Sequence, residues 1–271
     1  MDSLQFNLTR HWRHRALRIG LTLVFVALGC RTTLVTNRQQ VLFIPEDQEI
    51  QMGLSAYEET LGEHPPSQNQ EYIDLVNRVG QRIAAVADRP NYDWEFRVVA
   101  SEAPNAFALP GGKVAVNEGI LPICQNEAGL AVVMAHEVAH ALARHGGERM
   151  SQGMLVNGAS KALSYLTRQQ QVERQKQLMQ AFGVASKYGF SLPYSRKHEL
   201  EADHIGIMLM ARAGYDPTEA PVFWERFSQI NTSGASGHVR KFHGYHHITV
   251  RPRVASFAIA PRGARPPDGW T

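Results

Sequence analysis

His136-Glu137-Val138-Ala139-His140 is the stretch that decides the fold. On a helix its two histidines stand four residues apart and project from one face, within reach of a single zinc ion. Glu137 lies about 100° further around the helix, close enough to take a proton from a water that zinc activates. The pattern fixes only three positions, so it predicts a metal site only if its surroundings agree.

The surrounding residues predict a buried helix. Asn126 and Glu127 offer an N-cap and an acidic first turn, and Gly146-Gly147 offers a stop. Apolar residues recur at roughly helical spacing between these ends: Leu130, Val133, Met134, Val138, Ala141 and Leu142. Two histidines and a glutamate inside such a helix would be costly unless a metal satisfied them.

A catalytic zinc site needs a third protein ligand. The metzincin pattern would place a histidine six residues after His140, where this chain has Gly146, and His145 falls one place short. A second helical stretch offers Glu199 and Asp203 four residues apart on one face. One of these two carboxylates can bind zinc while the other orients a ligating imidazole. Glu201, between them in sequence, points elsewhere on the helix.

Four linked motifs resemble one family, the zinc metallopeptidases that include HtpX, the CAAX prenyl endopeptidases and the Oma-type proteases. They are 105–112 (NAFALPGG), the helix 126–145, 195–203 (SRKHELEAD) and 213–217 (AGYDP), within a match over about 45–255. The resemblance implies that His136, His140 and Glu199 bind one Zn²⁺, that Glu137 is the catalytic base, and that Asp203 supports a ligand without binding the metal.

The family also tends to have a late His-Pro followed by Arg-Ile. His247 and Arg253-Val254 keep that spacing, whereas Ile248 replaces the proline. By the family spacing, His247 is a candidate catalytic residue that stabilises the oxyanion. His238, His243, His246 and His247 could also suggest a second metal site, but their irregular spacing favours solvent-facing side chains.

The resemblance and the sequence pattern together predict an α+β fold that is predominantly helical, a zincin-like domain with a small sheet or hairpin beside the motif helix. Two helices are expected within 46–87, a strand over 94–100 and a hairpin around Pro110-Gly111-Gly112. The family's relatives bind substrate at the segment equivalent to Asn105, Ala106 and Phe107, which would accept an extended peptide as an added strand. The alternative is an ordinary hairpin.

The first 29 residues have the layout of a lipoprotein-type signal peptide. Arginines come first (Arg10, Arg13, Arg15 and Arg18), followed by an apolar run over 19–29 that is too short for an ordinary transmembrane helix. The junction before Cys30 resembles a bacterial lipobox, which implies lipid attachment to Cys30; an uncleaved anchor is the alternative. Either would tether the chain to a membrane. We therefore expect a periplasm-facing protein of the bacterial cell envelope, an outer-membrane lipoprotein.

The rest of the chain predicts one metallopeptidase domain over 30–260 and a disordered, Pro/Gly-rich tail over 261–271. The stretch 147–190 is an insertion, and its polar part 167–180 is either a solvated helix or a lid. The net charge of +3 includes the basic leader, and no basic patch carries interleaved aromatics, so no nucleic-acid partner is expected. Cys124 is most simply a core residue.

These features predict a zinc-dependent endopeptidase that hydrolyses unfolded or misassembled cell-envelope proteins. The competing hypothesis is a non-catalytic, chaperone-like binder of envelope polypeptides, which would need neither Glu137 nor an open zinc position. An exopeptidase would need a charged pocket for a substrate terminus, and no residue clearly provides one. Partners in envelope assembly are not identified by the sequence.

Overall fold

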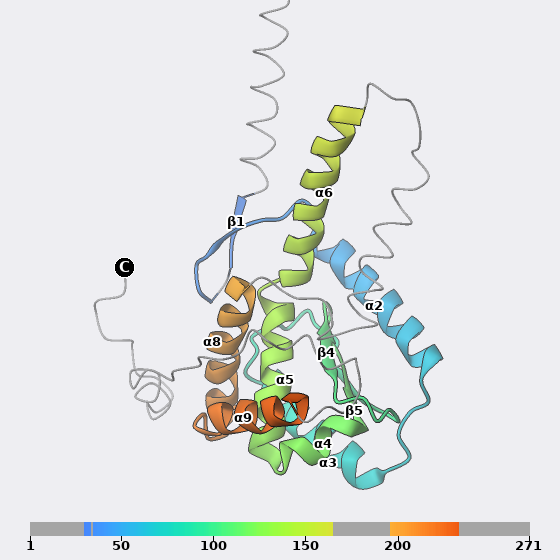
Figure 1. Cartoon of the computed structure of the whole chain (residues 1–271), viewed down its shortest axis with the longest axis vertical. Helices are drawn as coiled ribbons and strands as arrows, with labels where there is room; N and C mark the ends of the chain where they lie inside the picture. The colour runs from blue at the N-terminus through green and yellow to red at the C-terminus, as the bar shows by residue number, and fades with distance from the viewer. Residues whose placement is uncertain (1–29, 34, 165–195, 233–271) are drawn as a thin grey trace, which may run out of the picture.

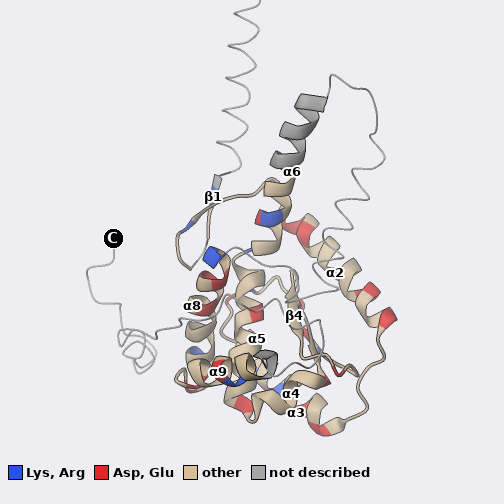
Figure 2. Ribbon diagram, viewed as in Figure 1, with Lys and Arg blue, Asp and Glu red and all other residues tan. Residues whose placement is uncertain are grey.

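The residues around the motif form α5 (Glu127–Leu142), the helix at the centre of the fold (Figure 1). Asn126 caps it as predicted, because its side-chain oxygen accepts a hydrogen bond from the backbone N–H of Gly129 at 2.9 Å. The helix is buried from Gly129 to its end. Figure 2 shows α5 in tan over most of its length, since Glu127 and Glu137 are its only Asp, Glu, Lys or Arg residues.

The predicted stop at Gly146-Gly147 is wrong. The chain breaks two residues earlier, at Arg144, which adopts a left-handed backbone with φ 57°. Both glycines then lie in the first turn of the next helix, α6 (His145–Ser164). A Cβ at Gly147 would stand 1.8 Å from an oxygen of Glu49, so this glycine permits a close approach between two segments and does not end a helix.

The computed structural model describes residues 30–33, 35–164 and 196–232. The remaining helices and strands are β1 (Cys30–Thr32), β2 (Gln39–Val41), α2 (Glu46–Glu63), α3 (Gln70–Ala84), β3 (Glu95–Val99), β4 (Ala106–Leu109), β5 (Lys113–Asn117), η1 (Glu118–Ile120), α4 (Leu121–Cys124), α8 (Arg196–Arg212) and α9 (Glu219–Thr232). The predicted helix pair, the strand and the hairpin are all present, and the predominantly helical α+β fold class is confirmed.

The larger sheet has three strands in the order β3-β5-β4. β4 and β5 form the expected antiparallel hairpin, and β3 pairs with β5 in parallel, with Phe96 opposite Val114. Gly111 and Gly112 have φ near +90°, which explains the two glycines at the turn. β4 is therefore an edge strand of this sheet, and it is also the strand that contacts α5 most extensively.

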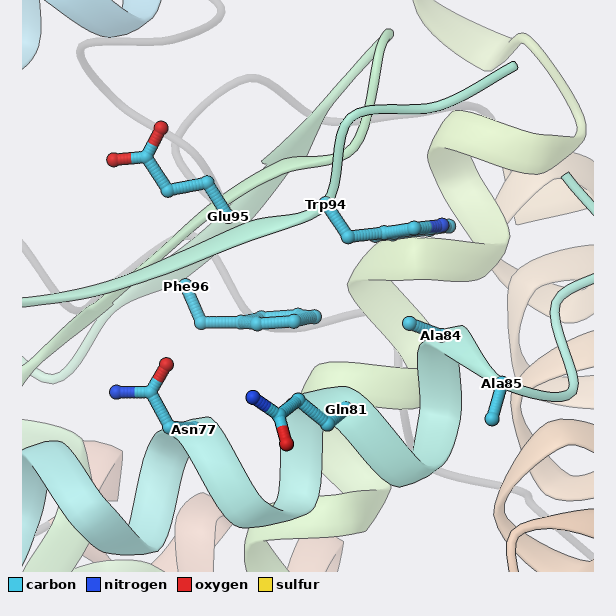
Figure 3. A pocket seen from close by; sticks show the side chains of 7 residues that line it. All are labelled: Asn77, Gln81, Ala84, Ala85, Trp94, Glu95 and Phe96. Atoms are coloured by element: carbon cyan, nitrogen blue, oxygen red, sulfur yellow. The ribbon is translucent and has the colours of Figure 1, made fainter. Parts of the chain in front are cut away.

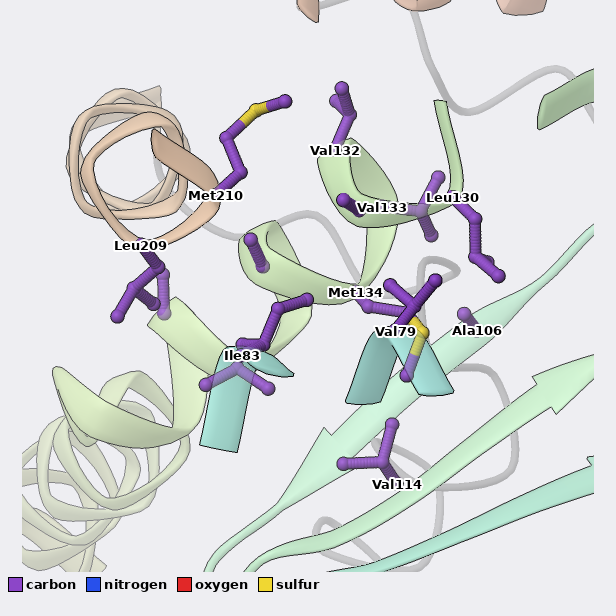
Figure 4. Close-up of a cluster of buried hydrophobic side chains, with 14 of the residues drawn as sticks. Val79, Ile83, Ala106, Val114, Leu130, Val132, Val133, Met134, Leu209 and Met210 are labelled. Atoms are coloured by element: carbon purple, nitrogen blue, oxygen red, sulfur yellow. The ribbon is translucent and has the colours of Figure 1, made fainter. Parts of the chain in front are cut away.

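The main hydrophobic core fills the space between α3, α5, α8 and the inner face of the sheet (Figure 4). Each of these elements contributes fully buried apolar side chains, among them Val79 and Ile83 of α3, Val114 of β5, Val133 and Met134 of α5, and Met210 of α8. Cys124 is buried in the same core, as expected. This packing holds α5 between the sheet and α8, the helix that carries Glu199 and Asp203.

A cavity of about 430 Å³ lies between α3 and β3 (Figure 3). The rings of Trp94 and Phe96 lie parallel on one side of it, at 6.2 Å between centroids. None of the motif residues lines this cavity. Within the described ranges, no helix combines the length and the apolar character required to cross a bilayer.

Candidate metal centre

Three side chains from α5 and α8 converge on one point. The Nε2 atoms of His136 and His140 lie 3.0 Å apart, and Glu199 Oε2 lies 3.5 Å from the first and 3.8 Å from the second. Donors around a tetrahedral zinc at 2.0–2.2 Å are separated by about 3.3–3.6 Å. The three separations of 3.0, 3.5 and 3.8 Å bracket this range, so shifts of a few tenths of an ångström would bring all three donors to zinc-binding distance, with one position left for a fourth ligand.

Gly206 allows α8 to approach α5 closely enough to form this triangle. A Cβ at Gly206 would lie 3.1 Å from the backbone nitrogen and Cα of His136. The two helices therefore cross almost backbone to backbone at Gly206. Glu199, about two turns earlier in α8, reaches the two histidines from there. His136 and His140 are buried, whereas the side chain of Glu199 is 20% exposed. The donor set is thus open to solvent on the side of Glu199.

Asp203 holds the other side of the His136 ring. Its Oδ1 lies 2.9 Å from His136 Nδ1, which leaves Nε2 to face the donor triangle. Burial lowers the pKa of His136, but the carboxylates of Asp203, Glu199 and Glu137 outweigh it and raise that pKa well above the ordinary value. This shift favours the protonated form of His136 when no metal is bound.

Glu137 lies beside the donors. Its Oε1 is 4.0 Å from His136 Nε2, and the residue is 5% exposed. Burial raises the pKa of Glu137 to about 8, with His136 opposing and Glu199 adding to this effect. A carboxyl group in this setting accepts and releases a proton near neutral pH, which is the property a general base requires.

A second set of polar residues behind the donors was missed in the sequence. His145 Nδ1 lies 2.9 Å from His140 Nδ1, and Glu201 Oε2 lies 3.0 Å from His145 Nε2. Glu201 does point away from Glu199 and Asp203, as expected, but it points into a buried network. Trp224 of α9 also packs edge-on against His136 at 5.3 Å between centroids. The position of His145, five residues after His140, is the one sequence feature that could have indicated this second set of polar residues.

The edge strand β4 carries the residues expected to bind substrate. The carbonyl of Asn105 accepts from Asn117 N–H at 2.9 Å, and Ala106 and Phe107 pair with β5. The side chains of Ala106 and Phe107 are buried in the two hydrophobic clusters. A peptide added at this edge would therefore meet their backbone and not their side chains.

Several expectations fall outside the described residues: the signal peptide over 1–29, the lid over 167–180, the histidine cluster that includes His247, and the tail over 261–271. Cys30 is described as the first residue of β1, opposite Val41. Among the described residues, His136, His140 and Glu199 form the single group that could hold a metal ion.

The chain is similar to curated metalloproteases. It is 40% identical over 195 residues to the mitochondrial metalloendopeptidase OMA1 of Schizosaccharomyces pombe, covering 71% of this chain and 56% of the relative. It is 32% identical to OMA1 of Saccharomyces cerevisiae, covering 82% and 67%. The beta-barrel assembly-enhancing protease of Escherichia coli is 28% identical, covering 66% and 37%. The chain thus spans little more than half the length of the S. pombe relative.

These relatives correct the expected location. Relatives from two fungi and a plant are named mitochondrial, so the placement in the bacterial cell envelope, facing the periplasm, is wrong. The physical reason is that arginine-rich segments poor in acidic residues precede mitochondrial as well as exported proteins. The arginines before residue 19 could not separate the two classes.

The family is shown by a direct match. The model of peptidase family M48 matches residues 67–256, more than half of the chain, and this range contains the HExxH helix, the edge strand and α8. The resemblance inferred from the four motifs is thereby confirmed. The chain is a member of M48, a metallopeptidase family.

Proposed function

We propose that this chain is a zinc-dependent endopeptidase whose metal is held by His136, His140 and Glu199. The observation that carries the proposal is the donor triangle of 3.0, 3.5 and 3.8 Å, with the buried carboxyl group of Glu137 beside it. Two imidazoles and one carboxylate form a donor set that zinc uses in catalytic sites. The metalloendopeptidase names of the relatives support the same activity.

Each residue has a distinct task in peptide hydrolysis. A zinc ion held by His136, His140 and Glu199 would act as a Lewis acid that polarises the scissile carbonyl and lowers the pKa of water. Glu137 takes a proton from the attacking water and passes it to the leaving amine. Asp203 keeps His136 in the tautomer that presents Nε2 to the metal. We assign His247 to oxyanion stabilisation on the family spacing alone.

We infer that the substrate is an extended polypeptide, bound as an added strand along β4. An edge strand offers backbone hydrogen bonds to many sequences, which suits a protease of unfolded or misassembled proteins. Relatives named beta-barrel assembly-enhancing proteases support proteins of a membrane envelope as substrates. The OMA1 relatives favour a mitochondrial compartment for this chain.

We also propose that the segment before residue 31 tethers the domain to a membrane through a retained apolar anchor. The apolar run over 19–29 supports this proposal, although it is shorter than an ordinary transmembrane helix. A retained anchor predicts that the natural protein keeps this segment in its N-terminal mass. A soluble natural protein from which the segment has been removed would contradict the tether.

The decisive experiment compares the full chain with its Glu137→Gln variant. The substitution keeps the metal donors and the side-chain size but removes the base. We expect both proteins to bind one zinc ion and only the unchanged chain to cleave unfolded casein. If both bind zinc and neither cleaves, while both suppress aggregation of an unfolded protein, the chaperone-like alternative replaces the proposal. Failure of the unchanged chain to bind zinc would refute the metal site itself.

A further inference from the structure

A buried series of hydrogen bonds runs from His140 to the N-terminal part of the described chain. His140 contacts His145, and His145 contacts Glu201, at 2.9 and 3.0 Å. Glu201 accepts from Arg38 Nε, and the two terminal nitrogens of Arg38 donate to Glu148 at 3.0 and 2.6 Å. His145 is fully buried, and Glu201 and Glu148 are nearly so. We refer to His145, Glu201 and Arg38 as the His145 network.

The positions of the protons in the His145 network follow from the tautomers of His140 and His145. If Nε2 of His140 binds a metal through its lone pair, Nδ1 of His140 must carry the proton. That proton is donated to Nδ1 of His145, so His145 keeps its own proton on Nε2 and donates it to Glu201. The carboxylate of Glu201 accepts it, and Arg38 balances the charge. Every proton then points away from the metal, in one consistent arrangement.

The backbone is shaped to place His145 in this position. The left-handed residue Arg144 separates α5 from α6, so His145 starts a new helix with its ring 4.9 Å from that of His140. Arg144 is itself held by the buried carboxylate of Glu49, at 2.8 and 3.1 Å. The turn and its ion pair therefore fix the first residue of α6 against the second histidine of the motif.

The two motif histidines are thus supported in different ways. Asp203 contacts Nδ1 of His136 directly, whereas Nδ1 of His140 contacts the imidazole of His145, which in turn contacts the carboxylate of Glu201. The residues of the His145 network do not form another metal site, because the guanidinium of Arg38 already lies between Glu148 and Glu201. Orientation of His140 is the role that this geometry leaves for them.

We propose that His145 is a positioning residue that fixes the ring and tautomer of His140 for metal binding, and that Glu201 and Arg38 anchor it. This inference rests on the metal site proposed above. Groups that orient a metal-bound histidine typically change metal affinity by about 10–100-fold when they are replaced. A residue needed only for packing would change stability and leave metal affinity unaltered.

The test compares His145→Phe and His145→Gln in the full chain. Zinc affinity is measured by competition with a chromophoric chelator, ligand geometry by the visible spectrum of the Co²⁺-loaded protein, and stability by thermal unfolding without metal. We expect His145→Phe to weaken zinc binding about 10–100-fold and to alter the cobalt spectrum. His145→Gln should restore most of both, because one amide can accept from His140 and donate to Glu201.

His198→Phe is the matched control. His198 stacks on His145 at 4.4 Å between centroids and bonds to Glu148, so its loss disturbs the same cluster one residue farther from His140. We expect lower stability with zinc affinity within about threefold of the unchanged chain. Equal losses of affinity in His198→Phe and His145→Phe would overturn the inference, as would unchanged affinity and cobalt spectrum in His145→Phe.

If His145→Phe does not fold, Glu201→Gln answers the same question, because it keeps the side-chain size and weakens the anchor. Weaker zinc binding in that variant supports the inference, and unchanged binding overturns it. The proposed function fails separately: in that case the unchanged chain binds no zinc, or binds zinc without cleaving casein.

Discussion

Gly146 and Gly147 are neighbours in the first turn of α6, yet replacement by alanine should affect them in opposite directions. A Cβ at Gly146 would meet nothing within 4 Å. A Cβ at Gly147 would lie 1.8 Å from Glu49 Oε1. Glu49 is fully buried and receives two hydrogen bonds from Arg144, so it cannot move aside without breaking a buried ion pair.

The magnitudes follow from these surroundings. Replacing glycine by alanine in a helix stabilises it by up to about 1 kcal/mol, and this is the whole effect expected at Gly146. At Gly147 the same gain is opposed by loss of the Glu49–Arg144 pair, since breaking a buried pair costs about 3–5 kcal/mol. The net change at Gly147 is then a destabilisation of about 2–4 kcal/mol.

Thermal unfolding of the full chain, at one fixed metal load, measures both changes. A chain of this size shifts its midpoint by about 2–3 °C per kcal/mol. We expect Gly146→Ala to raise the midpoint by up to about 3 °C and Gly147→Ala to lower it by about 4–12 °C. If both variants shift in the same direction, or if Gly147→Ala is as stable as the unchanged chain, the close approach of Glu49 is not what requires a glycine.

Three further predictions test other parts of the molecule. Burial raises the pKa of Glu148, but His198 and Arg38 outweigh this effect and lower the pKa to about 2 from an ordinary 4.5. Ionised Glu148 therefore adds roughly 3 kcal/mol to the free energy of unfolding. This contribution is fully present above pH 4.5 and is lost as the pH falls towards 2. Urea unfolding at pH 7 and pH 3 should therefore show a smaller difference between the unchanged chain and Glu148→Gln at pH 3. Gly80→Ala should destabilise by about 1–2 kcal/mol, because its Cβ would lie 2.4 Å from the Phe96 ring, whereas Gly62→Ala, with nothing within 4 Å, should not. Zinc at about 100 times its Kd should stabilise the chain by about 2.7 kcal/mol, and His140→Ala should abolish this gain. The measurement is the thermal unfolding midpoint of each protein at increasing concentrations of a zinc chelator.

Local patterns in the sequence are sufficient to predict the helices that carry the proposed metal donors. The motif helix was predicted because its cap and its apolar residues lie within one continuous stretch, and helical geometry places His136 and His140 together without reference to the rest of the fold. The pairing of Glu199 with Asp203 on one face of α8 had the same basis. The hairpin followed from the glycines that its turn requires.

Contacts between distant parts of the chain could not be predicted in this way. Arg38 and Glu201 are 163 residues apart, and no spacing rule connects them. The sequence pattern at Gly147 indicates a local helix stop, because the sequence does not show that Glu49 packs against this glycine. The composition of the leader does not determine the location either, since it is shared by proteins of different compartments.

The long-range contacts have a common origin in the composition of α5. The helix is apolar around its whole circumference, so His136 and His140 find few polar partners within α5 itself. α8 supplies partners from two of its faces: Glu199 and Asp203 meet the motif, and Glu201 meets the turn that carries His145. Arg38 then balances the charge that this arrangement buries. The proposed metal site and the residues proposed to orient it therefore come together only when α5, α8 and the segment between β1 and β2 are assembled, and metal binding and folding of these three elements should be thermodynamically coupled.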